Sequence, residues 1–321
     1  MGGSYRDTVI RCTSQVFAKA CLTRALDKLN RRRGGIILAF HEISHAQLSK
    51  HLTQLSELYT FISLSEFVSR LAQGKSTSRL AVITFDDGYG PVIESAAQLA
   101  QLHGWPMTFF LPTRFLDTCE PYWYQELRPL LERATREHIA VGGMSLLLRD
   151  QASIAKALDM LDRRFTSLSS YDEVDDLLRS IRYALLGSEE RPADLPTSQP
   201  IPWKRVRELV ACEELSFEAH SVNHLALSRL TAEAVREEMM QSRARIEEVT
   251  GRQVHHFCYP YGGLGEIGPL APRIACSLFR SATTMLRGRC HKDADPAMLP
   301  RIPLYEPDSE QKVALKVSFA R

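Results

Sequence analysis

The sequence lacks the cysteine patterns of disulfide-stapled and zinc-ribbon proteins. Its seven cysteines are scattered, odd in number and contain no C-x-x-C pair, a usage typical of a reducing compartment. No stretch approaches the roughly 18 consecutive apolar residues of a membrane-spanning helix. Charged residues interrupt the first part of the chain, which therefore lacks the apolar core of a secretory signal. These absences predict a cytoplasmic location.

The sequence also has little net charge, but that charge is unevenly distributed. The total is +2, whereas residues 1–33 alone carry eight Lys or Arg against two Asp, a net of +6. Apolar residues recur in this segment partly at helical spacing. One hypothesis is an amphipathic helix at the cytoplasmic face of an anionic membrane, and the alternative is a helix packed on the protein with its charges in water. Nucleic acid is not an expected partner, because the segment lacks interleaved aromatic residues that stack on bases.

The remaining sequence is that of a soluble globular α/β protein. It contains 44% hydrophobic and 24% charged residues overall, and no internal repeat is evident. Short apolar runs over 35–40, 80–85 and 107–111 alternate with helix-like stretches such as 91–103. This rhythm predicts parallel strands joined by helices, in a sheet or a barrel. In such folds the chemistry takes place at the carboxyl ends of the strands.

The rhythm is interrupted between about residues 115 and 200. This stretch contains helical patterns over 151–165 and 172–186, a cluster of aromatic residues and a Pro-rich end. We interpret 115–200 as a helical insertion within one main domain, 34–321, which follows the basic helical segment 1–33.

Two polar motifs follow predicted strands. Asp86 and Asp87 come directly after a buried strand and are followed by Gly88; a turn would explain the glycine but not the pair of acids. His220 and His224 are four residues apart, and on a helical turn this spacing puts both imidazoles on one face. Two histidines and one carboxylate form a common catalytic zinc set with an open position for water. The structural alternatives are a simple turn and two solvated histidines.

The combination of three motifs, in this order, resembles the polysaccharide deacetylases, which are also called the NodB-homology family or carbohydrate esterase family 4. The motifs are Thr84-Phe85-Asp86-Asp87-Gly88, His220-Ser221-Val222-Asn223-His224 and Tyr259-Pro260-Tyr261-Gly262. The likeness extends from about residue 35 to about residue 305. It implies a distorted (β/α)7 barrel and hydrolysis of N-acetyl or, less often, O-acetyl groups.

The resemblance also implies roles for individual residues. By position, Asp86 matches the general base, and Asp87, His220 and His224 match the ligands of one divalent metal ion, for which zinc is expected. The backbone N–H of Tyr261 is expected to bind the reacting oxygen.

Aromatic side chains near these motifs are candidates for substrate binding. We predict substrate contacts for Tyr259, Tyr261 and Trp123. Trp123, Tyr124 and Trp203 are candidates for a sugar platform, because aromatic faces suit the C–H surfaces of sugars, whereas for Trp105 packing is favoured. Packing in a core is the alternative use of such rings.

Two departures from the family pattern affect the catalytic groups. Cys258 stands where the third motif usually has an Arg that orients the base, and the segment 299–303 lacks the late His that supplies an acid in many members. His41, directly after the first strand, matches the acid of branches resembling poly-N-acetylglucosamine deacetylases. We therefore predict His41 as the acid, on the opposite side of the attacking water from Asp86, and Arg301 as the replacement partner of Asp86. A capping or core role is the alternative for His41.

The expected function is metal-dependent removal of N-acetyl groups from a sugar or glycan intermediate, including lipid-linked ones. Alternatives are a deformylase or O-deacetylase acting on a lipid-linked sugar, and a catalytically silent glycan-binding homologue. The missing Arg and late His favour the silent homologue. The retained Asp86 argues against it, because binding alone does not need a base.

Overall fold

The computed structural model describes residues 34–195 and 198–320. The basic segment 1–33 and the membrane contact expected of it lie outside the described residues. Among the helices of the described ranges, none is both long and apolar enough to cross a membrane.

Seven parallel strands form a closed barrel, which confirms the predicted (β/α)7 fold. Their order is β1-β10-β9-β8-β7-β4-β3, and β3 pairs again with β1 to close the ring. The two-residue strand β2 (Thr60–Phe61) pairs with β3 outside this ring. The barrel strands are β1 (Ile36–Phe40), β3 (Leu80–Phe85), β4 (Met107–Leu111), β7 (Leu215–Ala219), β8 (His256–Cys258), β9 (Ser281–Arg287) and β10 (Leu299–Pro303).

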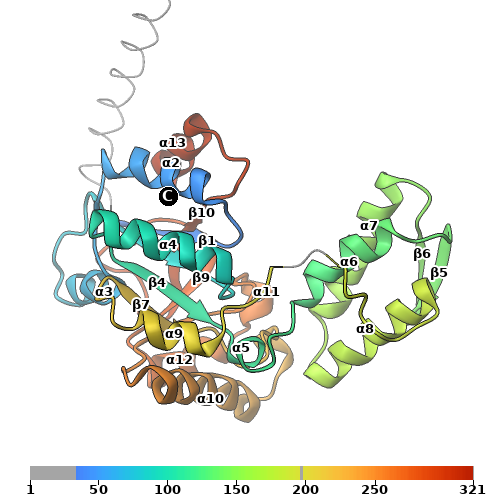
Figure 1. The fold of residues 1–321 in the computed structure, drawn as a ribbon. Coiled ribbons are helices and arrows are strands. Elements are labelled where there is room, and N and C mark those ends of the chain that lie inside the picture. The colour runs from blue at the N-terminus through green and yellow to red at the C-terminus, as the bar shows by residue number, and fades with distance from the viewer. Residues whose placement is uncertain (1–33, 196–197, 321) are drawn as a thin grey trace, which may run out of the picture.

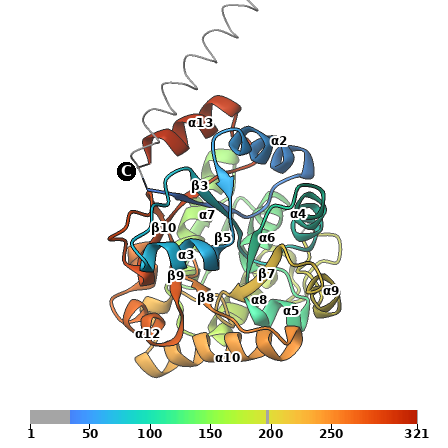
Figure 2. The same ribbon diagram turned by 90° about the vertical axis from the view of Figure 1, so that its left-hand side faces the viewer.

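Helices surround the barrel (Figures 1 and 2). They are α2 (His45–Ser56), α3 (Leu64–Ala72), α4 (Gly90–His103), α5 (Thr113–Thr118), α9 (Trp203–Leu209), α10 (Ala232–Thr250), α12 (Ala271–Leu278) and α13 (Glu310–Phe319). Three short helical segments lie in connecting loops: η1 (Leu227–Arg229), α11 (Leu264–Ile267) and η2 (Pro296–Met298).

The strands pack on both faces because neighbouring residues point to opposite sides. In β1, Ile36, Leu38 and Phe40 belong to a hydrophobic cluster shared with the surrounding helices, whereas Ile37 belongs to a second cluster. The second cluster also contains Val82, Phe110, Cys258 and Leu299, each from a different strand. It therefore marks the filled interior of the barrel, which leaves the carboxyl ends of the strands as the place for a site.

The predicted insertion lies between β4 and β7 and projects from the barrel on the side toward which the β4 arrow points (Figure 1). Beyond α5 it consists of α6 (Trp123–Glu132), the antiparallel hairpin β5 (His138–Val141) and β6 (Met144–Leu147), α7 (Gln151–Phe165) and α8 (Tyr171–Leu186). Its apolar residues form a separate hydrophobic cluster, to which Leu225 from the loop after β7 also belongs. The buried carboxylate of Glu126 in α6 is paired with Arg182 of α8 and with Arg191 beyond it.

Candidate active site

A cavity of about 330 Å³ lies at the carboxyl ends of the barrel strands. Most of the predicted site residues line it: His41, Asp86, Asp87, His220, His224, Tyr259 and Tyr261. Asp162 of α7 and Tyr124 of α6 also line it. The cavity is therefore formed jointly by the barrel and the insertion.

The turn after β3 separates the two neighbouring carboxylates. Asp87 and Gly88 both have left-handed backbones, with φ of 68° and 66°, a conformation that is costly for a residue with a side chain. A Cβ atom at Gly88 would also lie 3.1 Å from a methyl carbon of Leu111. As a result Asp86 contacts Arg301, while Asp87 faces the two histidines.

His220 and His224 lie in a loop, so the predicted helical turn is wrong. Ser221 and His224 have left-handed backbones, with φ of 64° and 53°, which no helix accommodates. One carboxylate oxygen of Glu238 accepts the backbone N–H groups of Val222 and Asn223 at 2.8 and 2.9 Å. These bonds hold the loop so that both imidazoles still face the cavity.

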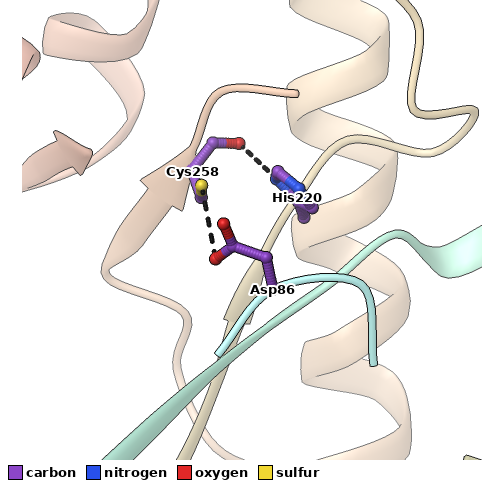
Figure 3. A group of neighbouring side chains, drawn as sticks. All are labelled: Asp86, His220 and Cys258. Carbon is purple, nitrogen blue, oxygen red and sulfur yellow. Dashed lines mark hydrogen bonds between the residues drawn. The ribbon is translucent and has the colours of Figure 1, made fainter. Parts of the chain in front are cut away.

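The side chains of Asp87, His220 and His224 fit a divalent metal ion. The Nε2 atoms of His220 and His224 lie 3.6 and 3.3 Å from Asp87 Oδ1, and Oδ1 is buried without a hydrogen-bond partner. One potential ligand atom from each residue lies within 4.8 Å of the other two. The Cys258 carbonyl, 2.7 Å from His220 Nδ1, turns Nε2 toward the site (Figure 3), as expected for a metal-binding imidazole.

The interactions among Asp87, His220 and His224 favour the ionised form of the Asp87 carboxylate. Burial by itself would raise the pKa of Asp87, but the interactions with His220 and then His224 outweigh it and hold the pKa well below its usual value. Burial lowers the pKa of His224. Burial by itself would lower the pKa of His220, but the side chains of Cys258 and Asp87 outweigh burial and raise this pKa well above its usual value. A carboxylate and neutral imidazoles are the forms that bind a metal ion, so an ion would displace the proton of His220 as it binds.

Arg301 contacts both carboxylate oxygens of Asp86. Its Nη1 and Nη2 donate to Oδ1 and Oδ2 at 2.7 and 2.6 Å, and its side chain is fully buried. Burial would raise the pKa of Asp86, but the charge and hydrogen bonds of Arg301 lower it below its usual value. Asp86 is therefore ionised at neutral pH.

The strand geometry explains how Arg301 reaches Asp86. The register between β9 and β10 shifts between Leu299 and Arg301, an irregularity of the kind that re-aims side chains near active sites. The Thr284 carbonyl accepts a hydrogen bond from Arg301 Nε at 2.8 Å. Cys258 stands where the resemblance places the family Arg, and its Sγ lies 3.1 Å from Arg301 Nη2. The same Sγ lies 3.7 Å from Asp86 Oδ1, and Figure 3 shows these two side chains facing each other.

His41 lies beside Asp86 and not across the site from it. Its Nε2 atom is 3.5 Å from Asp86 Oδ2, and its side chain is 34% exposed. The predicted position opposite Asp86 is therefore wrong, because β1 and β3 are paired neighbours whose ends place the two side chains together.

The three predicted substrate contacts differ in position. The Tyr261 ring packs edge-on against His224 at 4.9 Å and lines the cavity. Tyr259 also lines it, although its hydroxyl donates to the Ala297 carbonyl at 2.8 Å. Trp123 is only 4% exposed and stacks on Phe165 in the core of the insertion.

Sequence reasoning missed the contact of Tyr124 with Asp87, one of the three candidate metal ligands. Its hydroxyl donates to Asp87 Oδ2 at 2.8 Å. The aromatic cluster over 122–124 was a signal, but the sequence does not tell which ring of three in a row faces the cavity. The role of Glu238 in holding the loop from His220 to His224 could not be predicted from the sequence, because Glu238 looks like any acidic residue on an amphipathic helix.

Comparison with known proteins identifies the family. The polysaccharide deacetylase pattern matches residues 73–267, so the chain belongs to the polysaccharide deacetylase family. No curated protein matches the sequence significantly.

Three solved structures share the fold at low sequence identity. The deacetylase PplD of Streptococcus pyogenes, in complex with acetate, is 14% identical with a TM-score of 0.56, over 88% of this chain and 97% of that one. IcaB from Ammonifex degensii is 17% identical with a TM-score of 0.54, over 90% and 98%. The BpsB deacetylase domain from Bordetella bronchiseptica is 14% identical with a TM-score of 0.53, over 84% and 96%.

Proposed function

We propose that the protein removes N-acetyl groups from a sugar or glycan, using a divalent metal ion, zinc in our expectation, held by Asp87, His220 and His224. The observation that carries this proposal is the unpartnered Oδ1 atom of Asp87, which faces both imidazoles next to the ionised, Arg-paired Asp86. A protein that only binds glycans would gain nothing from burying an ionised carboxylate such as Asp86 beside a set of metal ligands.

The groups around the cavity divide the proton transfers between them. When bound, the ion would activate a water molecule and polarise the acyl carbonyl. Asp86, kept ionised by Arg301, accepts a proton as the water oxygen attacks the acyl carbon. The Tyr261 backbone N–H donates to the oxygen on which negative charge develops. His41 then donates a proton to the amine nitrogen as the C–N bond breaks. Asp86 afterwards releases the proton it took from water to solvent, and the partly exposed ring of His41 regains one.

The position of Arg301 supports an active enzyme over a silent homologue. The family Arg is absent at Cys258, yet a guanidinium binds both oxygens of Asp86. A deformylase or an O-deacetylase would use the same groups, so the acyl group removed must be measured directly.

The decisive experiment supplies zinc-loaded protein with N-acetylated and N-formylated sugars, free and lipid-linked, and measures acetate and formate. We expect acetate release. Asp86→Asn should retain the ion but lower turnover by about 10²–10⁴-fold, the usual contribution of a general base. His224→Ala should lose the ion with little loss of fold. Full metal content in His224→Ala, or undiminished acetate release by Asp86→Asn, would refute these roles.

We also propose that the enzyme works in the cytoplasm on a glycan intermediate at the membrane face, attracted by residues 1–33. The net charge of +6 in this segment supports the proposal, since each basic residue near an anionic surface contributes about 1 kcal/mol. Full-length protein should bind phosphatidylserine vesicles in low salt, and a variant beginning at Gly34 should not. Equal binding by both would refute it.

A further inference from the structure

The helical insertion places a tyrosine hydroxyl against one of the three candidate metal ligands of the barrel, Asp87. Tyr124, near the start of α6, donates from its hydroxyl to Asp87 Oδ2 at 2.8 Å. The hydroxyl of Tyr89, from the segment after β3, lies 2.9 Å from that of Tyr124. Two residues before Tyr124, the buried Tyr122 donates to the backbone carbonyl of Asp87. The side-chain oxygen Oδ2 and the backbone carbonyl of Asp87 therefore both accept hydrogen bonds from α6 and its N-cap residue.

The direction of the bonds follows from counting protons. A phenol has one O–H, and that of Tyr124 is used on Asp87 Oδ2, because a carboxylate oxygen only accepts. The O–H of Tyr89 must then donate to the Tyr124 oxygen. The chain runs from Tyr89 through Tyr124 to Asp87, and each bond in such a series polarises the next.

We propose that Tyr124 is a positioning residue for Asp87: it fixes Oδ2 and so presents the unpartnered Oδ1 to the metal ion. This inference rests on the proposed metal-dependent function. The terminal torsion of an aspartate is soft and roughly two-fold, so a carboxylate without such a bond would rotate between its two oxygens.

The two histidine ligands are held differently, which makes the tyrosine bond more important. His220 is oriented by the Cys258 carbonyl at Nδ1. Nδ1 of His224 is buried without a hydrogen-bond partner, and its ring packs edge-on between Tyr122 and Tyr261. Asp87 is therefore the ligand side chain that a hydrogen bond from the insertion orients.

The insertion consequently contributes to metal affinity as well as to the cavity wall. Beside Tyr124, Gln125 of α6 donates to Glu42 at 3.0 Å, and Glu42 follows His41 at the end of β1. A displacement of α6 relative to the barrel would break the Tyr124–Asp87 bond before it disturbed any barrel strand.

The test measures zinc affinity of the full-length protein by competition with a chromophoric chelator. Tyr124→Phe should bind zinc about 10- to 100-fold more weakly, the usual effect of removing a partner of a metal ligand. Tyr183→Phe is the matched control: it removes the same hydroxyl from α8, where the side chain is 62% exposed, and should leave the affinity unchanged. Affinity of Tyr124→Phe equal to that of the control would overturn the proposal.

A second readout separates positioning from general structural damage. The activity of Tyr124→Phe should be low at limiting zinc and recover substantially as zinc is raised, whereas a distorted fold would not recover. If Tyr124→Phe does not fold, Tyr89→Phe decides, since it keeps the bond to Asp87 but removes the donor behind it. We expect affinity weakened about two- to fivefold, and unchanged affinity would overturn the inference. Absence of zinc binding by the unaltered protein would instead contradict the proposed function itself.

Discussion

Replacing Arg301 by Met should destabilise the protein strongly, because it leaves a buried carboxylate without its counter-charge. The side chains of Arg301 and Asp86 are 0% and 2% exposed and share two hydrogen bonds. Removing one partner of such a buried pair typically costs about 3–5 kcal/mol. Met approximates the length of the arginine stem, so lost packing contributes little.

The pH dependence of this loss has a definite sign. In the unaltered protein the pKa of Asp86 is lowered, so its ionised form contributes stability that is present above the unfolded-state pKa of 3.8 and lost as pH falls through the folded value. Without Arg301, burial dominates and raises the folded pKa above that of the unfolded chain. The variant's contribution from Asp86 is then present at low pH and lost as pH rises, so its deficit should widen from pH 5 to pH 8.

Urea unfolding followed by circular dichroism measures both effects. The double variant Asp86→Asn, Arg301→Met should recover most of the stability at pH 8, because no buried charge remains in the pair. A deficit below about 1 kcal/mol in Arg301→Met, or a deficit that does not change with pH, would refute the argument that Arg301 compensates the charge of Asp86.

Three further predictions concern groups around the same barrel. Burial raises the pKa of Glu218 to about 8 from 4.5, so its contribution to stability is present below pH 4.5 and lost as pH rises through 8. Glu218→Gln should therefore exceed wild-type stability at pH 9 by up to about 5 kcal/mol in urea unfolding, and equal stability would contradict this. Glu238→Ala frees two backbone donors of the histidine loop and should weaken zinc binding about tenfold in chelator competition; unaltered affinity would show that the loop holds itself. His41→Ala should cripple hydrolysis of an N-acetyl sugar but spare an activated aryl acetate, whose phenolate leaves unaided; equal losses on both substrates would remove His41 as the acid.

The strands that were predictable from the sequence are those with mostly apolar runs. The runs over 35–40, 80–85 and 107–111 correspond to β1, β3 and β4 within a residue. β9 was not predicted, because its residues Thr283 and Thr284 are polar although fully buried. Their hydroxyls donate to backbone carbonyls of the neighbouring strands. A strand whose buried polar side chains find hydrogen-bond partners in this way shows no apolar pattern in the sequence.

The candidate site was predictable where local sequence carried the chemistry and not where distant segments meet. The His220–His224 spacing indicated two imidazoles on one side, but the same spacing arises from a loop with left-handed residues as from a helix. The place of His41 beside Asp86 depends on which strands are neighbours, and the Tyr124 contact depends on how α6 lies over the barrel. Neither the His41–Asp86 contact nor the Tyr124–Asp87 contact can be predicted from the spacing of residues along the chain.

The guanidinium that pairs with Asp86 comes from β10, whereas the family pattern supplies it at the position of Cys258 in β8. Both side chains reach the same carboxylate inside the barrel, so the interior offers more than one strand from which that charge can be provided. A survey that sorts homologues into active and inactive by the residue at one aligned column would discard chains such as this one. The criterion that this barrel suggests is spatial: whether any strand delivers a cation to the base, whatever its place in the alignment.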